Sequence, residues 1–370
     1  MTKLRVLFVP PVPDFKGGAE HSLFDLIANP DIEAHLAVPA EGPLSERASS
    51  LGVPTHVVEY GSVLSIRRPF KVMDGVRVLA DALSAARQLN AIAQRNKIDI
   101  IHTNGLKSHI VAAIARMLRR RVVVVHVRDI AYTGVEKLVW KLLPWVSSRV
   151  VLVSRACWPA ETLPNKVVVV ANGIPVPDSA PPARVGRPIR IAFVGRIHPH
   201  KGLHDLLDWL AEALAAGVDA HLAVRGQFAP ETPHYRGQIE AQIVARGLSE
   251  HVRFDGYVSD ASKLYQGVDI VCVPSFAPEP FGRAVIEPMA RGMPVLATPV
   301  GGMAELFIEG ESGFFVRNAA DFRNALAKLA AEPAFVEAMG QAAHRRCRDL
   351  YSLEALHKKT NAVYAELASS

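Results

Sequence analysis

Several short segments of this chain are apolar at nearly every position, and they limit its fold more than any other feature. Examples are RVVVVHV at residues 121–127, VVLV at 150–153 and IVCV at 270–273. A strand with one face in water alternates apolar and polar residues, whereas a strand of a parallel sheet is covered on both faces and forms a continuous apolar run. The runs therefore predict parallel sheets enclosed by helices.

Helical patterns separate these runs, for example at 70–95, 106–118 and 203–214. Alternation of strands with helices is typical of βαβ units and of a doubly wound α/β sheet. The expected strands are Leu4–Pro10, Ala34–Val38, Thr55–Val58, Ile98–His102, Val122–Val127, Val150–Val153, Val167–Ala171, Ile189–Val194, His221–Val224, Val252–Phe254, Ile270–Val273, Val295–Ala297 and Gly313–Val316.

One segment interrupts the alternation. Residues 172–188, NGIPVPDSAPPARVGRP, contain five prolines and no hydrophobic period, which is typical of a linker. A chain of 370 residues also exceeds the usual size of one core. We therefore expect two α/β domains joined near residue 180, and a final helix at 352–368.

The composition predicts a globular protein of a reducing compartment. The chain is 49% hydrophobic and 21% charged, and its three cysteines show no CxxC spacing. No apolar run approaches the roughly 18 residues that a membrane span needs, and the first apolar segment looks like a core strand rather than a signal peptide. We expect a cytoplasmic protein without a metal site.

The charge is distributed unevenly along the chain. Residues 1–175 contain 22 Lys and Arg against 14 Asp and Glu, a net charge of +8, while the whole chain carries +6. The basic residues include Arg67, Arg68, Lys71, Arg116, Arg119, Arg120 and Arg121. Such a surface favours phosphates, acidic lipid or nucleic acid, or it is simply solvated. Trp140 and Trp145, at helical spacing with Lys and Leu, are either core residues or membrane contacts.

In open α/β sheets, ligands bind where strands end and helices begin. After the first strand, Gly17 and Gly18 allow a backbone to approach a phosphate or sugar, or they are ordinary loop glycines. No GxGxxG stands in the chain, which disfavours a dinucleotide-dependent dehydrogenase. His126 lies near the end of an apolar strand, either as a core residue or facing a ligand, with Asp129 after it.

Two later loops carry charged residues. In GRIHPHKG, Arg196 and Lys201 flank a turn before a helix, a setting suited to a diphosphate and one that makes a metal unnecessary for charge neutralisation. PEPFGRAVIEPMARG contains Glu279 and Glu287. These two residues either accept hydrogen bonds from hydroxyls of a ligand, form an acid/base pair, or lie on the surface. Pro288 predicts a kinked or short helix.

These motifs carry a family likeness. FVGRIHPHKG, VRFDGYV and PSFAPEPFGRAVIEPMARGMPVLATPVGGMAELFIEGESGFFV resemble the C-terminal half of family 4 retaining glycosyltransferases (glycosyl transferases group 1). The N-terminal half is similar more loosely, through GGAEHS, IDIIHTNG, HVRD, LVSRA and VVANGI. The resemblance implies a GT-B fold: two Rossmann-like domains facing a cleft. It assigns 1–178 to the acceptor, 179–350 to a nucleotide-sugar donor, and 351–370 to a helix crossing back to the first domain.

The resemblance also implies roles for single residues. Arg196 and Lys201 match the pair that binds the donor diphosphate, Glu279 the acid that binds sugar hydroxyls, and Glu287 the acid that binds ribose. His126 matches the histidine near the donor C6 hydroxyl and the reacting carbon. The remaining donor-binding positions that it implies are Gly17, Gly18, Gly195, Phe281 and Gly282. The family often has His-Asp where this chain has His126-Val-Arg128-Asp129, so the resemblance assigns no role to Arg128 and Asp129.

The implied activity is retaining, metal-independent hexosyl transfer to an acceptor hydroxyl, with no cofactor beyond the donor. The expected setting is polysaccharide, lipopolysaccharide or glycolipid assembly, with a sugar or lipid-linked acceptor and peripheral contact with an acidic membrane at its cytoplasmic face. Two alternatives stay open. One is a nucleotide-sugar epimerase on the same fold, and the other is a binder of anionic ligands or nucleic acid, which no nucleic-acid motif in the chain supports.

Overall fold

The computed structural model describes residues 3–15, 17–65, 75–258, 260 and 263–369. The chain forms two compact units. Unit 1 is Met1–Gly173 with Leu353–Ser370, and unit 2 is Ile174–Ser352. The divisions after 173 and 352 fall a few residues from the expected 178 and 350. Arg67, Arg68, Lys71 and residues 70–74 of the expected helix lie outside the described residues.

Unit 1 is built on a seven-stranded sheet in the order β3-β2-β1-β4-β5-β6-β7, and every pair of neighbours is parallel. The strand order reverses between β1 and β4, because the chain first builds outward to β3 and then returns. Its strands are β1 (Leu4–Val9), β2 (Ile32–Val38), β3 (Thr55–Val57), β4 (Ile100–Thr103), β5 (Val122–Val127), β6 (Arg149–Leu152) and β7 (Val167–Val169).

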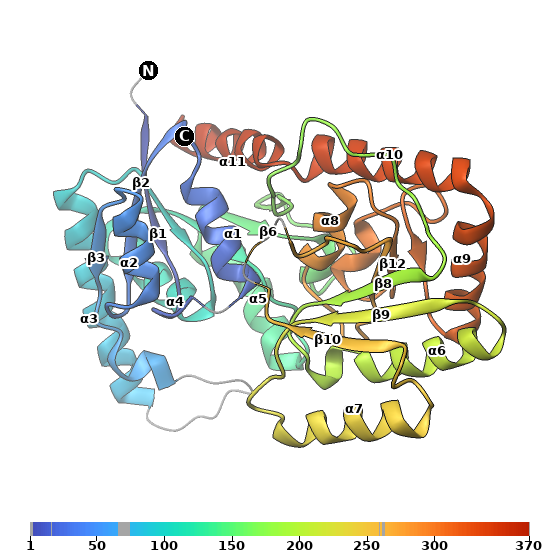
Figure 1. Ribbon diagram of the computed structural model, residues 1–370. Helices are drawn as coiled ribbons and strands as arrows, with labels where there is room; N and C mark the ends of the chain where they lie inside the picture. The colour runs from blue at the N-terminus through green and yellow to red at the C-terminus, as the bar shows by residue number, and fades with distance from the viewer. Residues whose placement is uncertain (1–2, 16, 66–74, 259, 261–262, 370) are drawn as a thin grey trace. The chain divides into compact units, whose positions relative to one another are not determined.

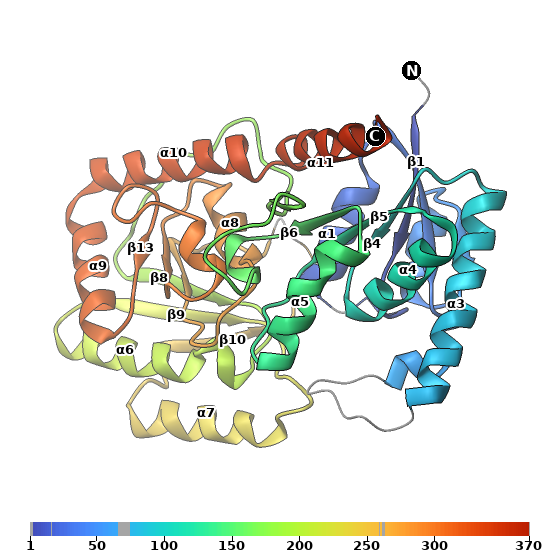
Figure 2. The same cartoon turned by 180° about the vertical axis from the view of Figure 1, so that it is seen from behind.

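Helices cover both faces of this sheet. Figure 1 shows α1 and α2 in front of the strands, and Figure 2, seen from behind, shows α4 and α5 in front. This matches right-handed crossovers, which place helices before and after the reversal on opposite faces. The helices are α1 (Gly18–Ile27), α2 (Pro43–Ser50), α3 (Gly75–Arg95), α4 (Leu106–Arg119), α5 (Gly134–Val146) and α11 (Leu353–Ala368), with short 3₁₀ turns at Gly61–Ser65 and Arg155–Cys157.

The last helix belongs to the core of unit 1. Leu356, Val363 and Tyr364 of α11 are buried in one cluster with side chains of α1, α2 and the strands, including Phe8 and Val124. Polar contacts also hold the helix: His357 Nε2 lies 2.7 Å from the Asp25 carbonyl oxygen.

Unit 2 is built on a six-stranded parallel sheet in the order β10-β9-β8-β11-β12-β13, which reverses between β8 and β11. Its strands are β8 (Ile189–Val194), β9 (Ala220–Arg225), β10 (Val252–Gly256), β11 (Ile270–Val273), β12 (Val295–Ala297) and β13 (Phe314–Phe315). Its helices are α6 (Leu203–Ala215), α7 (Pro233–Ala245), α8 (Arg283–Met289), α9 (Ala319–Ala331) and α10 (Pro333–Leu350), with 3₁₀ turns at Pro199–Lys201 and Gly302–Glu305.

The expected parallel sheets are confirmed, and each expected strand overlaps an observed one. The reason is visible in β5, where Val123, Val124, Val125 and Val127 are all buried. Alternate side chains of a strand point to opposite faces, so both faces of this strand are covered and an apolar residue is needed at every position.

Candidate active site

One candidate site lies in unit 2, at the reversal point of its sheet, where β8 and β11 end. The turn after β8 contains Gly202, whose φ is +73°. A Cβ on Gly202 would stand 2.0 Å from the Pro274 carbonyl oxygen, which follows β11. Phe276 N also donates to the His200 carbonyl oxygen at 3.2 Å. Only glycine therefore allows the two loops to pack this closely.

This packing brings Lys201 and Glu279 together. Lys201 Nζ lies 2.8 Å from Glu279 Oε2, and the Ser275 hydroxyl donates to the other carboxylate oxygen. The backbone of Glu279 is fixed as well, because Gly302 N donates to its carbonyl oxygen at 2.7 Å. Gly301, with φ of +58°, leaves the space in which a Cβ would stand 2.3 Å from that oxygen. The carboxylate is thus held at a defined position, with one fifth or less of its side chain exposed.

Arg196 makes a separate ion pair. Its guanidinium binds Glu231 Oε1, in the loop that precedes α7. Arg196 and Lys201 nevertheless lie near the same two histidines, because both cations lower the pKa of His198 and of His200, although burial is the main cause of each shift. The centroids of the two imidazole rings lie 4.0 Å apart. The turn therefore combines two cations with imidazoles that are neutral at pH 7.

Glu287 lies in α8, the helix that begins after Gly282. Tyr265 donates to its carboxylate at 3.1 Å, and Arg283 Nε donates to the other oxygen at 3.1 Å. A carboxylate oxygen can accept two hydrogen bonds, so each oxygen of Glu287 can accept a further one from a ligand. Burial, followed by the Glu287 charge, raises the pKa of the Tyr265 hydroxyl well above its usual value, so Tyr265 keeps its proton.

The surroundings of α8 explain its motif. A Cβ on Gly282 would stand 2.9 Å from Leu306 Cδ1, so this glycine is needed for packing. Phe281 is buried, with its ring 5.9 Å from that of Tyr351. Pro288 lies in the last turn of a helix of only seven residues, in agreement with the short helix that Pro288 predicts.

A separate candidate site lies in unit 1, where β4 and its neighbour β5 end. His126 is 1% exposed, and its Nδ1 lies 3.0 Å from His102 Nε2. His102 Nδ1 lies in turn 2.6 Å from the Tyr364 hydroxyl of α11. Burial, then the charge of Arg128, lowers the pKa of His102 to about 3 and that of His126 well below its usual value. Both imidazoles are neutral at pH 7.

Arg128 closes this group of side chains. Its Nη1 donates to Asn172 Oδ1 at 2.6 Å, its Nε donates to Asn104 Oδ1, and its Nη2 lies 3.5 Å from His126 Nδ1. Sequence reasoning missed His102, Asn104, Asn172 and Tyr364. The signal for His102 was its place at the end of an apolar strand, the same signal that singled out His126.

The glycines of the sequence motifs fall into two kinds. Gly195 has φ of +134°, which requires glycine, and a Cβ on Gly226 would stand 1.8 Å from its carbonyl oxygen. Gly17 is extended, with φ of −162°, and its N–H donates to Glu20 Oε2 at 2.8 Å at the start of α1. Gly18 is the exposed first residue of that helix. The backbone conformation therefore explains the glycine at 195, whereas neither φ nor packing gives a reason for the glycine at 17.

The two tryptophans of α5 separate. Trp140 is 1% exposed, as the core interpretation predicts, whereas Trp145 is 83% exposed. In the part of the chain that the structure describes, no helix is long and apolar enough to cross a membrane. Among the same residues, no group of three or more His, Cys, Asp or Glu is placed to hold a metal ion.

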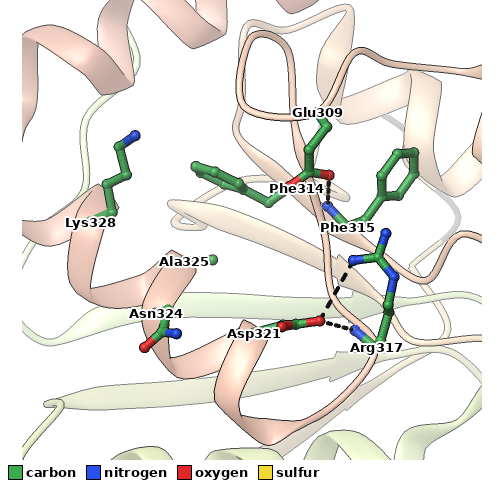
Figure 3. A pocket seen from close by; sticks show the side chains of 8 residues that line it. All are labelled: Glu309, Phe314, Phe315, Arg317, Asp321, Asn324, Ala325 and Lys328. Carbon is green, nitrogen blue, oxygen red and sulfur yellow. Dashed lines mark hydrogen bonds and ion pairs between the residues drawn. The ribbon is translucent and has the colours of Figure 1, made fainter.

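A separate shallow pocket of about 240 Å³ lies in unit 2 between β13 and α9 (Figure 3). Three of its charged groups are already paired: Glu309 accepts from Phe315 N at 2.6 Å, and Arg317 lies 3.7 Å from Asp321. It contains none of the residues that the motifs single out. We therefore place the candidate site of unit 2 at the loops after β8 and β11, and the candidate site of unit 1 at the ends of β4 and β5.

Two known families match the chain, one over most of each unit. The family described as "Glycosyl transferases group 1" matches residues 178–346, and that described as "Glycosyl transferase 4-like domain" matches residues 21–173. The two ranges cover most of both units. The chain belongs to the glycosyl transferases of group 1, with a family 4-like N-terminal half.

Two curated relatives illustrate the likeness. The phosphatidyl-myo-inositol mannosyltransferase of Mycobacterium leprae is 34% identical over 166 residues, which are 43% of this chain and 42% of that protein. The lipopolysaccharide core biosynthesis mannosyltransferase LpcC of Rhizobium leguminosarum is 32% identical over 190 residues, 50% of this chain and 53% of that protein. The chain thus spans about half the length of the curated relatives it matches.

Solved structures show the fold over the whole chain. HepE of Anabaena, in complex with UDP, is similar with a TM-score of 0.80 and 21% identity, covering 98% of this chain and 100% of that chain. A glycosyltransferase of Rickettsia africae gives a TM-score of 0.80 with 19% identity, covering 99% of each chain. The fold is GT-B, with two Rossmann-like parallel-sheet domains.

Proposed function

We propose that this protein transfers a hexose, with retention of configuration, from a nucleotide-diphosphate sugar to an acceptor hydroxyl. The observation that carries the proposal is the Lys201–Glu279 pair, 2.8 Å apart at the reversal point of the unit 2 sheet. A cation beside a fixed carboxylate suits a ligand that joins a diphosphate to a sugar. The names of the relatives, mannosyltransferases of lipid or lipopolysaccharide, support the same class of reaction, and one structure of HepE contains UDP-glucose.

In this proposal each charged group has one role toward the donor. Lys201 and Arg196 bind the diphosphate, which carries the negative charge of the leaving group. Glu279 accepts hydrogen bonds from hydroxyls of the transferred sugar, and Glu287 from hydroxyls of the ribose. The backbone at Gly195, Phe281 and Gly282 lies in the same loops and lines the donor site.

The proposed chemistry needs no covalent intermediate with the protein. The acceptor oxygen attacks the anomeric carbon on the side of the leaving group, the bond from that carbon to the diphosphate oxygen breaks, and a phosphate oxygen takes the acceptor proton. The protein positions the two substrates and stabilises the departing diphosphate. Lys201 and Arg196 supply that charge, so we expect transfer that does not depend on a divalent metal.

The test is turnover of UDP-, GDP- and ADP-sugars by the purified protein, with and without EDTA. A thermal-shift screen against the same donors first selects the donor. We expect slow hydrolysis or transfer that EDTA leaves unchanged and that Glu279→Ala lowers by about 10²- to 10³-fold. Glu240→Ala is the matched control, since Glu240 is an exposed, ion-paired carboxylate of α7 in the same unit. Normal turnover in Glu279→Ala would contradict the site.

The same assay separates the epimerase alternative. An epimerase converts the donor to a second sugar nucleotide with no acceptor present, and NMR of donor and protein alone detects that product. A transferase gives only slow hydrolysis under these conditions. Accumulation of an epimerised donor would overturn the proposed reaction.

We also propose that the acceptor is lipid-linked and that α5 of unit 1 meets an acidic membrane surface. Four apolar side chains of α5, spaced by three or four residues, are more than half exposed: Val135, Leu138, Leu142 and Trp145. Residues three or four apart share one helix face, so they form an exposed apolar stripe. Basic residues flank the stripe: Lys137 and Lys141 on the same helix, and Arg116 and Arg120 in a hollow of about 510 Å³ that Trp145 also lines.

Vesicle sedimentation tests this surface. We expect binding to vesicles containing phosphatidylglycerol, little binding to pure phosphatidylcholine, and weaker binding at high salt. Trp145→Ser should lower the bound fraction severalfold. Val244→Ser is the control, because Val244 of α7 is 73% exposed but belongs to unit 2. Equal loss in both variants, or no preference for acidic lipid, would rule out α5 as the contact.

A further inference from the structure

A buried chain of three hydrogen-bonding side chains connects the last helix of unit 1 to His126. Tyr364 of α11, His102 of β4 and His126 of β5 follow one another at 2.6 and 3.0 Å, and each is 1% exposed. Tyr364 and His102 are 262 positions apart in the sequence. Nothing in the proposed reaction uses His102 or Tyr364.

The position of each proton follows from Arg128. A guanidinium only donates, and Arg128 Nη2 lies 3.5 Å from His126 Nδ1. A proton on that Nδ1 would face the arginine N–H, whereas a lone pair there is attracted by its positive charge. His126 Nδ1 is therefore the acceptor, and His102 Nε2 is the donor in the 3.0 Å contact between the two rings.

The positions of the other protons in this hydrogen-bonded series then follow. His102 is neutral and carries its one proton on Nε2, so its Nδ1 is bare and accepts a hydrogen bond from the Tyr364 hydroxyl. Burial raises the pKa of that hydroxyl, which keeps its proton. His126 is neutral as well and has its single proton on Nε2. Every proton in the chain points from α11 toward His126.

The far end of the chain has a donor to spare. His126 Nε2 is buried and has no hydrogen-bond partner among the described residues. A buried N–H without an acceptor is unfavourable by about 1–3 kcal/mol, so such groups usually have a function. His126 is also the second-to-last residue of β5, at the carboxyl edge of the sheet, where ligands of such sheets bind.

We propose that Tyr364 and His102 are positioning residues that hold His126 in the tautomer with its proton on Nε2, so that His126 donates a hydrogen bond to a hydroxyl oxygen of the substrate. In this state His126 is neutral and donates a hydrogen bond. It does not take up the proton that the hydroxyl of the acceptor substrate loses. The step involves no bond breaking at His126. The substrate part of this inference rests on the proposed glycosyl transfer, while the tautomer part does not.

The tautomer is measurable without substrate. In protein labelled with ¹⁵N-histidine, two-bond ¹⁵N–¹H correlations distinguish the two neutral forms, and His102→Gln and His126→Gln assign the signals. We expect His102 and His126 in the Nε2–H form, with no titration between pH 5 and 8. Finding the His126 proton on Nδ1 in the wild-type protein would overturn the proposal, whatever the protein's activity.

Three variants test the role of the chain. Arg128 contacts His126 Nδ1 only at 3.5 Å, so it favours this tautomer without enforcing it. Tyr364→Phe removes the first donor, and we therefore expect His102 and His126 to populate both tautomers. His102→Leu removes the donor to His126, whereas His102→Gln keeps an N–H that reaches the same nitrogen, so only the leucine variant should shift the His126 signal. An unchanged His126 tautomer in both Tyr364→Phe and His102→Leu contradicts the proposed role.

Kinetics completes the test with a matched control. We expect Tyr364→Phe to lower kcat about fivefold with little change in the donor KM, as the loss of one hydrogen bond predicts. Tyr60→Phe removes another buried hydroxyl of unit 1, which is bonded to Ser108 at 3.2 Å, and should leave kcat unchanged. Equal kcat losses in the two variants would indicate a structural effect only. If the protein transfers no sugar, the proposed function fails while the NMR result still decides the tautomer.

Discussion

Each unit has a candidate site at the carboxyl end of its parallel sheet, yet the two sites differ in charge. In unit 2, the loops at the reversal point hold a Lys201–Glu279 ion pair whose side chains are 27% and 17% exposed. In unit 1, His102 at the end of β4 and His126 at the end of the next strand, β5, are buried and neutral, and Arg128 lies beside them. The carboxyl ends of the two sheets thus supply two different environments.

The difference suits two kinds of ligand group. A diphosphate is charged, and fixed cations bind it with little reorganisation. A sugar hydroxyl is neutral, and neutral hydrogen-bond donors and acceptors bind it without burying an unpaired charge. We therefore interpret unit 2 as the part that binds the charged half of the donor and unit 1 as the part that binds neutral hydroxyl groups.

The largest effect is expected from removing the unit 2 cation. Lys201→Met keeps most of the side-chain volume but leaves Glu279 without its partner and the diphosphate without a charge, so kcat/KM should fall about 10²- to 10³-fold. Steady-state kinetics measures this. Lys263→Met, at an exposed lysine of the same unit, is the control.

The pair can be tested further with Glu279→Gln. Lys201 and Glu279 are in contact, so the losses in the single variants should not add in the double variant. Additive losses would show that the ion pair does not act as a unit. The difference between the charged site of unit 2 and the neutral site of unit 1 would then rest on burial alone.

The second effect concerns the glycine that brings the unit 2 loops together. Gly202→Ala forces a residue with a Cβ into φ of +73° and places that Cβ 2.0 Å from the Pro274 carbonyl oxygen. The strained backbone and the overlap should together lower the free energy of unfolding by about 3 kcal/mol. Urea denaturation measures this loss.

Gly217→Ala separates the two causes. Gly217 has φ of +87°, but a Cβ there would meet no atom within 4 Å. We expect about 1–2 kcal/mol in this control, from the backbone alone. A loss in Gly202→Ala no larger than in Gly217→Ala would mean that the two loops of unit 2 are not held as tightly as the structure indicates.

The sequence predicts the charged site of unit 2 better than the neutral site of unit 1. Arg196, Lys201, Glu279 and Glu287 lie in two short motifs that directly follow strands, so a reader of the sequence can place them at one sheet edge. Their partners were not predicted: Ser275 and Tyr265 look like ordinary loop residues until packing brings them to the carboxylates.

The neutral site of unit 1 depends on contacts between distant segments. His126 was singled out by its place in β5, but its neighbour Tyr364 lies on a helix that comes after all of unit 2. The apolar stripe of α11 predicts a buried face and does not say which buried position carries a hydroxyl toward His102. The pairing of β4 with β5, and of both with α11, is a property of the folded chain.

The third effect is a loss of stability in acid that originates in unit 1. His102 stays neutral when folded because its pKa falls from the usual 6.5 to about 3. Between these values the unfolded chain binds a proton that the folded chain does not, so the free energy of unfolding decreases as the pH falls below 6.5. The decrease is about 1.4 kcal/mol per pH unit for one such histidine. From pH 6.5 to 5.0 we expect about 2 kcal/mol from His102.

Urea denaturation of wild-type protein and His102→Gln at several pH values isolates this contribution. His126, His109 and Arg128 also act on the His102 pKa or lie close to it, so part of the acid sensitivity remains in the variant. The difference between the two slopes should still approach one proton. Parallel curves for the two proteins would show that His102 is not kept neutral by the fold.

The smallest effect on stability is expected at Gly17, and there it is the activity that is informative. Its backbone is extended, and a Cβ would stand 3.5 Å from Glu20 Oε2, an ordinary contact. Gly17→Ala should therefore lower the free energy of unfolding by at most about 1 kcal/mol, because Gly17 is the N-cap of α1 and alanine is a poorer N-cap than glycine. Gly134→Ala, at the first residue of α5, is a control with no atom near its Cβ. Because neither packing nor φ requires glycine at position 17, a fall in kcat/KM beyond that of the control would mean that a substrate approaches this backbone. Equal kcat/KM in the two variants would remove Gly17 from the donor site and leave Gly195, whose φ does require glycine, as the glycine that shapes its loop.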